Sequence, residues 1–167
     1  MRYLDTLKNE HNKPKIFSRE QAQLKAESYC AYQERSQFEV RNKLYEWGLA
    51  PKDVEEILSE LIDRNFLNEE RFSIAYTLGK FRIKGWGKVK IKQGLQLKKI
   101  PGKMIQKALL MIDEDDYLVS LRKLIEKKSN LLLEKDPFKR RYLLSRYAAS
   151  KGYEPELIHD IFGDLAD

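Results

Sequence analysis

Eleven lysines and arginines lie between Arg71 and Ile112, a stretch that contains no aspartate or glutamate. Cationic side chains at this density attract nucleic-acid phosphate, an acidic protein surface or anionic lipid. Lys84, Lys88 and Lys92 are spaced four residues apart with no acidic partner between them, and like charges at that spacing repel. A solvated helix face is the ordinary alternative, but such faces usually mix both signs. The stretch is therefore interpreted as an anion-binding surface, with lipid the weakest candidate because no long amphipathic apolar segment accompanies it.

Most of these cations, together with Trp86, form the predicted contact surface. Trp86 stands between two glycines, where its ring can stack on a base, anchor a protein contact or pack on a neighbouring helix. The turn from Gly85 to Lys88 can cradle a phosphate at a helix start, although a plain helix-to-helix turn is favoured. The predicted contact residues are Lys80, Arg82, Lys84, Trp86, Lys88, Lys90, Lys92, Lys98, Lys99 and Lys103.

The remaining reactive side chains predict no catalytic or metal chemistry. Cys30 is the single cysteine and is expected to be a buried small apolar residue, while His11 and His159 have no nearby partner for acid–base work. No phosphate-binding loop motif occurs. We therefore expect no enzyme activity, no cofactor and no metal. A single cysteine and the absence of a long apolar run favour a cytoplasmic protein that does not enter a membrane.

The net charge of +6 over 167 residues is unevenly distributed. Residues 1–70 carry a net −3, residues 71–112 carry +11 and residues 113–167 carry −2. The middle of the chain therefore holds more than the whole excess of positive charge, which assigns the predicted anion-binding surface to one segment.

Start and stop signals along the chain predict nine helices and no strand. Capping boxes begin at Ser18 and Ser36, and Asn68 followed by two acids predicts a further helix start. Prolines mark further starts, and glycines mark the ends. The first helix is expected at about residues 19–33, the second opens at Ser36 and stops at Gly48, and the third starts near Pro51 and carries Val54, Ile57, Leu58 and Leu61. The other six are expected at about residues 69–84, 88–99, 103–112, 117–128, 137–150 and 155–165.

The nine helices fall into three similar sets of three. A shift of 51 residues places Val40 on Ile91 and Leu44 on Leu95, and a further shift of 53 residues continues the apolar match. Such self-similarity predicts an all-α fold of three tandem three-helix repeats in an elongated array. The predicted divisions are an N-terminal tail at 1–17, repeat 1 at 18–64, the basic repeat 2 at 65–112 and repeat 3 at 113–167.

Three stretches of the sequence resemble the RecX family of bacterial RecA regulators. Residues 35–44 resemble its R-S-x-x-E-L-x-x-K-L motif, residues 65–73 its G-Y-L-D-D-x-R-F-A motif, and residues 85–100 its G-x-G-x-x-x-I-x-x-x-L-x-x-K-G-I motif. The sequence departs from these motifs at Asn65, Asn68, Gly94 and Lys99, where the family has Gly, Asp, an acid and Gly. Asn tolerates left-handed geometry and caps helices, so the first two departures are mild.

The resemblance implies a curved array of three three-helix units that binds in the groove of the RecA–DNA filament. It implies inhibition of RecA's ATP hydrolysis and strand exchange, some direct affinity for single- or double-stranded DNA, and no catalysis. The main hypothesis is therefore a RecA regulator that acts as a monomer and modulates recombination, DNA repair and the SOS response.

The alternative is a stand-alone DNA-binding protein whose three-helix units act like helix-turn-helix modules. Neutralising about five phosphates would give that protein a log–log salt slope of roughly −4 to −5. The sequence leaves open whether DNA or the recombinase supplies most of the binding energy, and whether filament ends or filament grooves are bound.

Overall fold

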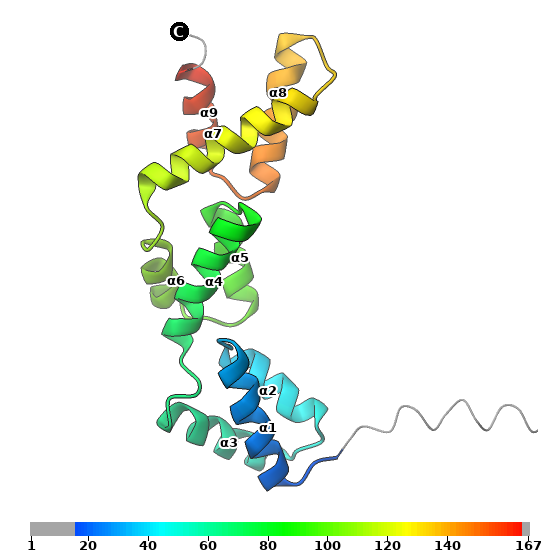
Figure 1. Cartoon of the computed structure of the whole chain (residues 1–167), viewed down its shortest axis with the longest axis vertical. Helices are drawn as coiled ribbons and strands as arrows, with labels where there is room; N and C mark the ends of the chain where they lie inside the picture. Colours follow the sequence, from blue (N-terminus) through cyan, green and yellow to red (C-terminus); the bar gives the residue numbers. More distant parts are fainter. Residues whose placement is uncertain (1–15, 165–167) are drawn as a thin grey trace, which may run out of the picture. The chain divides into compact units, whose positions relative to one another are not determined.

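The computed structural model describes residues 16–164, which contain nine helices and no strand (Figure 1). The predicted tail lies almost wholly outside these residues. The helices are α1 (Arg19–Tyr32), α2 (Gln37–Glu46), α3 (Pro51–Asp63), α4 (Glu69–Lys84), α5 (Lys88–Leu97), α6 (Gly102–Leu109), α7 (Glu114–Leu131), α8 (Pro137–Ser150) and α9 (Pro155–Asp164). Repeat 1 contains α1–α3, repeat 2 contains α4–α6 and repeat 3 contains α7–α9.

Local capping chemistry explains where several helices begin. The hydroxyl of Ser18 accepts the backbone N–H of Gln21, and the hydroxyl of Ser36 accepts that of Glu39. In both cases the third residue of the helix returns a side-chain bond to the cap backbone, which confirms the two predicted capping boxes. Asp113 and Asp136 cap α7 and α8 in the same way with their carboxylates.

The second helix of every repeat ends in the same hydrogen-bonded turn. Gly48, Lys99 and Gly152 adopt φ values of +83°, +60° and +94°. The residue after each donates its N–H five residues back: Leu49 to Leu44 O at 3.3 Å, Ile100 to Leu95 O at 3.2 Å and Tyr153 to Ala148 O at 3.3 Å. This is a Schellman turn repeated three times, and it confirms the repeat in backbone geometry.

The apolar positions that the repeat superposes are buried. Val40, Ile91 and Leu144 are between 0% and 5% exposed, as are Val54, Ile105 and Ile158 at the next matched position. In α5, only Ile91 and Leu95 enter the core, whereas Val89 and Leu97 are exposed. The scattered apolar residues of this helix therefore divide into a narrow buried face and a solvent-facing one.

The chain forms two compact units, residues 1–68 and 69–167. Repeat 1 has a core of its own, made by residues such as Val40, Leu44, Ile57 and Leu61, with Cys30 buried in it as expected. Repeats 2 and 3 share one continuous core, in which Phe81 of α4 and Tyr117 of α7 meet at a ring separation of 5.8 Å.

The largest differences from the expected helix bounds are at both ends of α7 and at the end of α6. α7 begins at Glu114 rather than near Tyr117, because Asp113 caps it and the acids that follow form its first turn. It also continues to Leu131. α6 ends at Leu109 instead of Ile112, because 3₁₀-type bonds from Met111 and Ile112 close the last turn.

Candidate anion-binding surface

The start of α5 is covered by repeat 3, and this determines what the Gly85–Lys88 turn can do. The N–H of Gly87 donates to Lys151 O at 2.8 Å and the N–H of Val89 to Gly152 O at 2.9 Å. The intervening N–H of Lys88 donates to the Tyr117 hydroxyl at 2.8 Å. All three N–H groups at this helix start already have acceptors within the protein. The turn therefore is the helix-to-helix connection that was favoured, and these donors are not free to cradle a phosphate.

Two glycines allow this close approach of backbones. A Cβ at Gly87 would lie 2.3 Å from the carbonyl carbon of Gly152, and a Cβ at Gly152 would lie 2.2 Å from the Cβ of Lys90. No side chain fits at either position, so the pair lets α5 and the α8–α9 turn make backbone hydrogen bonds. Gly87 and Gly152 thus fix the position of α5 against repeat 3.

Tyr117 is the polar centre of the same junction. It is 1% exposed, accepts from the Lys88 N–H and donates to Glu154 Oε2 at 2.7 Å. Its ring lies 5.0 Å from that of Tyr153, whose hydroxyl is 3.0 Å from the Ser120 hydroxyl. Burial raises the pKa of the Tyr117 phenol far above its usual range; the Lys88 N–H opposes this, and Glu154 adds to it. The phenol therefore stays a neutral donor and acceptor.

Lys88 is not the unpartnered cation that its spacing suggested. Its ammonium group lies 2.5 Å from Glu114 Oε1 and 4.7 Å from the centroid of the Tyr117 ring, and its side chain is only 20% exposed. Moreover, Lys84 ends α4 and Lys88 begins α5, so the three lysines spaced four apart do not form one helical stripe. The partner that the local sequence lacked comes from repeat 3, across 26 residues of sequence.

Trp86 is half-buried against the core of the second unit and is flanked by two lysines. The ammonium groups of Lys80 and Lys90 each lie 4.8 Å from its ring centroid. Lys90 also donates to Ser150 O at 3.3 Å. Part of the Trp86 ring thus packs on the core, as one of the three interpretations expected, and its contact with a base or a protein stays a prediction.

The side chains of five predicted contact residues make no hydrogen bond or ion pair within residues 16–164. They come from the end of α4, from α5, from the turn after it and from α6: Arg82, Lys84, Lys92, Lys99 and Lys103. All five are exposed. Lys98, half-buried at the end of α5, has an interaction of its own. We call these five residues the free cation set of repeat 2.

Two departures from the family pattern now have local explanations. A Cβ at Gly94 would lie 2.2 Å from the Tyr76 hydroxyl, so the glycine makes room for the α4 tyrosine against α5. Lys99 adopts left-handed backbone at φ +60°, a geometry that costs a non-glycine residue about 1–2 kcal/mol. Its exposed ammonium is therefore held at a position where glycine is conformationally easier.

The sequence did not reveal the ion pairs that remove two cations from this surface. Lys88 is paired with Glu114, and Lys107 of α6 is paired with Glu70 of α4. Both acids lie just outside the acid-free stretch, where Glu70 lies in the first turn of α4 and Glu114 begins α7. Their position in first turns was the available signal, because helices favour acids there and repeats bring helix starts close to neighbouring helices.

No metal-binding cluster of histidine, cysteine or acidic side chains occurs in the described part of the chain, and none of its helices is long and apolar enough to span a membrane. The free cation set can bind anions by charge, and Lys80 and Lys90 place two further cations at Trp86.

Family models and relatives agree with this architecture. Models of the first, second and third three-helix domains of RecX match residues 22–61, 68–109 and 114–162. The chain is 32% identical to regulatory protein RecX of Clostridium perfringens over 80% of its length and 63% of that protein, so it spans less than two thirds of that relative. It is 31% identical to regulatory protein RecX of Haemophilus influenzae, with 80% and 87% covered.

Solved structures show the same fold. The crystal structure of RecX from Lactobacillus salivarius matches with a TM-score of 0.79 at 22% identity, covering 89% of this chain and 96% of that one. A second crystal structure, of a regulatory protein RecX, matches with a TM-score of 0.74. The three matched domain models and the 31% identity to the Haemophilus influenzae protein establish that the chain belongs to the RecX family.

Proposed function

We propose that this chain binds in the groove of the RecA–DNA filament and inhibits RecA's ATP hydrolysis and strand exchange. It would thereby modulate recombination, DNA repair and the SOS response. The names of its relatives, regulatory protein RecX, support a regulatory role. We further propose that it acts as a cytoplasmic monomer, through binding and without catalysis.

The free cation set of repeat 2 carries this proposal. Its five members are exposed, and none has an anionic partner within residues 16–164. Bringing such charges to a polyanion releases condensed counterions and relieves their mutual repulsion, and both effects favour binding. Phosphates and acidic recombinase surface are both suitable anions.

Trp86 adds a second mode of contact. The ring is half-buried and the ammonium groups of Lys80 and Lys90 each lie 4.8 Å from its centroid, so a base that stacks on it would bring its phosphates close to two cations. Trp47, the only other tryptophan of the sequence, is partly buried against the core of the other unit. In a Trp47→Phe background, quenching of the remaining fluorescence by single-stranded DNA would report directly on Trp86.

The decisive test reverses three members of the free cation set, Arg82→Glu, Lys84→Glu and Lys92→Glu together. Lys88 is left intact, because its loss would remove the ion-pair partner of Glu114 and disturb the junction with repeat 3. The assay is ATP hydrolysis by the cognate recombinase on single-stranded DNA, titrated with this protein at two salt concentrations. We expect the variant to lose inhibition while its helical circular dichroism is retained.

The matched control reverses three exposed lysines of repeat 3, Lys123→Glu, Lys127→Glu and Lys135→Glu, and so makes the same change in net charge. This control should inhibit nearly as well as the wild type. Equal inhibition by the repeat 2 variant and the wild type would refute the proposed surface. Sequence-specific binding to bare duplex DNA without any effect on ATP hydrolysis would instead support the helix-turn-helix alternative.

A further inference from the structure

The groove between the second and third helices differs among the three repeats. In repeat 1 it is closed by Arg41 of α2, which donates to both carboxylate oxygens of Glu55 on α3 at 2.8 and 3.1 Å. The repeat shifts place Arg41 on Lys92 and Ser145, and Glu55 on Gln106 and His159. Repeat 3 therefore has a short hydroxyl side chain where repeat 1 has a guanidinium, and no carboxylate opposite it.

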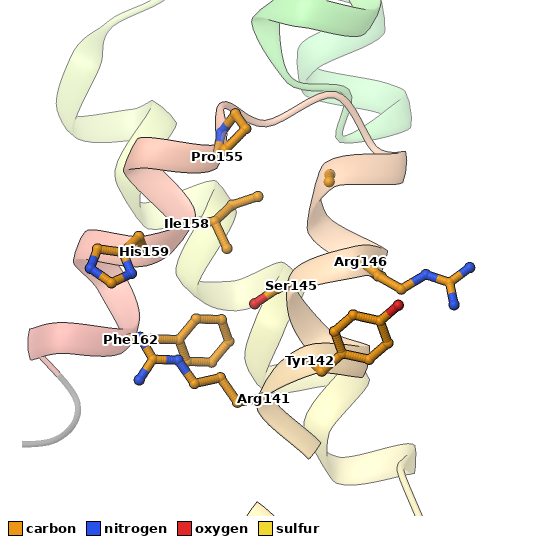
Figure 2. A pocket seen from close by; sticks show the side chains of 9 residues that line it. Arg141, Tyr142, Ser145, Arg146, Pro155, Ile158, His159 and Phe162 are labelled. Carbon is orange, nitrogen blue, oxygen red and sulfur yellow. The ribbon is translucent and has the colours of Figure 1, made fainter. Parts of the chain in front are cut away.

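The result is an open pocket of about 370 Å³ between α8 and α9. Figure 2 shows the side chains of α8 on one side and those of α9 on the other, with Ser145 between the two helices. Its apolar surface comes from Ala149, Pro155, Ile158 and Phe162. Because Ile158 is buried in the core of the second unit, the pocket floor is rigid and does not depend on exposed loops.

Two arginines of α8 line the pocket. The guanidinium of Arg141 lies 5.4 Å from the ring centroid of Phe162, and that of Arg146 lies 5.7 Å from the ring of Tyr142. Both arginines are exposed, and neither side chain makes an ion pair or hydrogen bond in the part of the chain that the structure describes. Stacking on a ring orients each guanidinium without using its N–H donors, so the donors remain free for an incoming carboxylate.

We propose that this pocket binds an acidic protein segment that carries one bulky apolar side chain between carboxylates. The apolar side chain would fill the space between Ile158 and Phe162, and the flanking carboxylates would pair with Arg141 and Arg146. Repeat 1 shows the same chemistry within the chain, since its groove holds a carboxylate against an arginine. This site lies outside the free cation set of repeat 2 and does not rest on the proposed function.

A protein segment fits this pocket better than a nucleic-acid strand does. Apolar side chains line the space between the helices, and an apolar side chain of a protein segment fills that space without burying a polar base or a charged phosphate. A strand would also continue along α9, where the exposed Glu156 and Asp160 repel phosphates. A short segment contacts only the pocket and its two arginines.

The test uses fluorescent peptides and the full chain. The probe is Asp-Glu-Phe-Asp-Glu, with Asn-Gln-Phe-Asn-Gln and Asp-Glu-Ala-Asp-Glu as probes that lack the charge or the ring, and anisotropy measures binding. We expect the first peptide to bind and the other two to bind at least about tenfold more weakly, as expected for a lost charge-assisted contact or buried ring. Arg141→Glu should weaken the first peptide by a similar factor, whereas Lys139→Glu, an equal charge change on the same helix, should not.

A second variant closes the pocket by copying repeat 1. The double substitution Ser145→Arg and His159→Glu places an arginine and a carboxylate where Arg41 and Glu55 stand, and it should abolish peptide binding with no loss of helicity. The repeat 2 variant Arg82→Glu, Lys84→Glu, Lys92→Glu should still bind the peptide, so this test and the ATP hydrolysis test can fail separately. No binding by the wild type, equal binding of all three peptides, or preferential capture of oligothymidylate by the pocket would overturn the proposal.

Discussion

Repeat 1 and repeat 2 treat their positive charges in opposite ways. All seven lysines and arginines of residues 18–64 have a partner: five pair with acids of the same repeat, while Lys25 and Arg35 lie over aromatic rings. Repeat 2 has more cations; Lys88 and Lys107 are ion-paired, whereas Arg82, Lys84, Lys92, Lys99 and Lys103 have no side-chain partner in the described residues. The same three-helix fold thus carries cations with partners in repeat 1 and a surface that can bind anions in repeat 2.

The difference shows that charge composition changes what a repeat can bind without changing its fold. Exposed ion pairs contribute little to stability, so the loss of acids from repeat 2 costs the fold little. It leaves a repulsive surface whose electrostatic energy falls when a polyanion binds. In repeat 1 most cations are already paired with acids of the same repeat, so they are not available to bind a polyanion.

The two repeats also differ in how they complete their cores. Repeat 1 buries its own core within the first unit, whereas repeat 2 shares one with repeat 3. The shared core and the junction at Gly87 and Gly152 hold α5 against a rigid neighbour. The free cations of repeat 2 therefore lie on a braced surface.

The largest expected effect concerns the junction between α5 and repeat 3 at Gly87 and Gly152. Gly152→Ala combines a φ of +94° with a Cβ placed 2.6 Å from the Lys90 N and 2.2 Å from its Cβ, so it should destabilise the second unit by about 2–5 kcal/mol. The repeat-equivalent Gly48→Ala meets only the flexible Ile16 side chain, at 3.3 Å, and should destabilise the first unit by about 1–2 kcal/mol.

Tryptophan fluorescence can follow the two units separately in urea. Trp86 reports on the second unit in a Trp47→Phe background, and Trp47 reports on the first in a Trp86→Phe background. Equal decreases in the free energy of unfolding for Gly152→Ala and Gly48→Ala would show that the contact between α5 and Gly152 does not stabilise the second unit.

A smaller effect is expected when repeat 2 is given the acid of repeat 1. Gln106 occupies the position of Glu55, and Lys92 that of Arg41. Gln106→Glu should pair with Lys92 and remove one cation from the free set, lowering DNA affinity a few-fold and the magnitude of the salt slope by roughly 1. DNA-binding titrations over a range of salt measure both quantities.

Asn130→Asp on α7 makes the same charge change at an exposed position of repeat 3 and serves as the control. An unchanged slope for Gln106→Glu would exclude Lys92 from the phosphate contacts.

The smallest effect concerns the ion pair that closes the groove of repeat 1. The hydrogen bond from Arg41 lowers the pKa of Glu55 below its usual range. The contribution of this ion pair to stability is therefore present above the pKa of Glu55 in the unfolded chain, near 4.3. It is lost as the pH falls through the lower pKa of Glu55 in the folded protein. Because Glu55 is 57% exposed, the expected contribution is only about 0.5 kcal/mol.

Urea unfolding of the first unit, followed by Trp47 between neutral pH and pH 3, measures this contribution. Glu55→Gln should be less stable than the wild type at neutral pH and nearly equal to it at the acid end. A difference between the two proteins that persists at the lowest pH would show that the residue stabilises the unit by packing and not by charge.

Much of the helical framework was predictable because its signals are local. Capping boxes at Ser18 and Ser36 act over three residues, and the superposed apolar positions follow from the helical period. The breaks at Gly48, Lys99 and Gly152 also aligned in the sequence, although only the backbone shows that Lys99 adopts the same left-handed turn as its two glycine counterparts.

The availability of each cation was not predictable from sequence spacing. Lys84, Lys88 and Lys92 look equivalent in the sequence, but Lys88 meets Glu114 and lies over the Tyr117 ring. Ion pairing depends on separation in space, and the partner stands on a helix of the next repeat. For the same reason the Gly85–Lys88 turn looked open to a phosphate, while its donors are bonded to Lys151, Tyr117 and Gly152.

The sequence by itself determined the helices, the threefold repeat and the concentration of positive charge between Arg71 and Ile112, because caps, periodicity and composition act over short stretches of chain. Only the tertiary structure decided which cations are free, that Gly87 and Gly152 join α5 to repeat 3, and that the groove closed by Arg41 in repeat 1 is open in repeat 3. Those features depend on contacts between residues far apart in the chain, and folding alone brings them together.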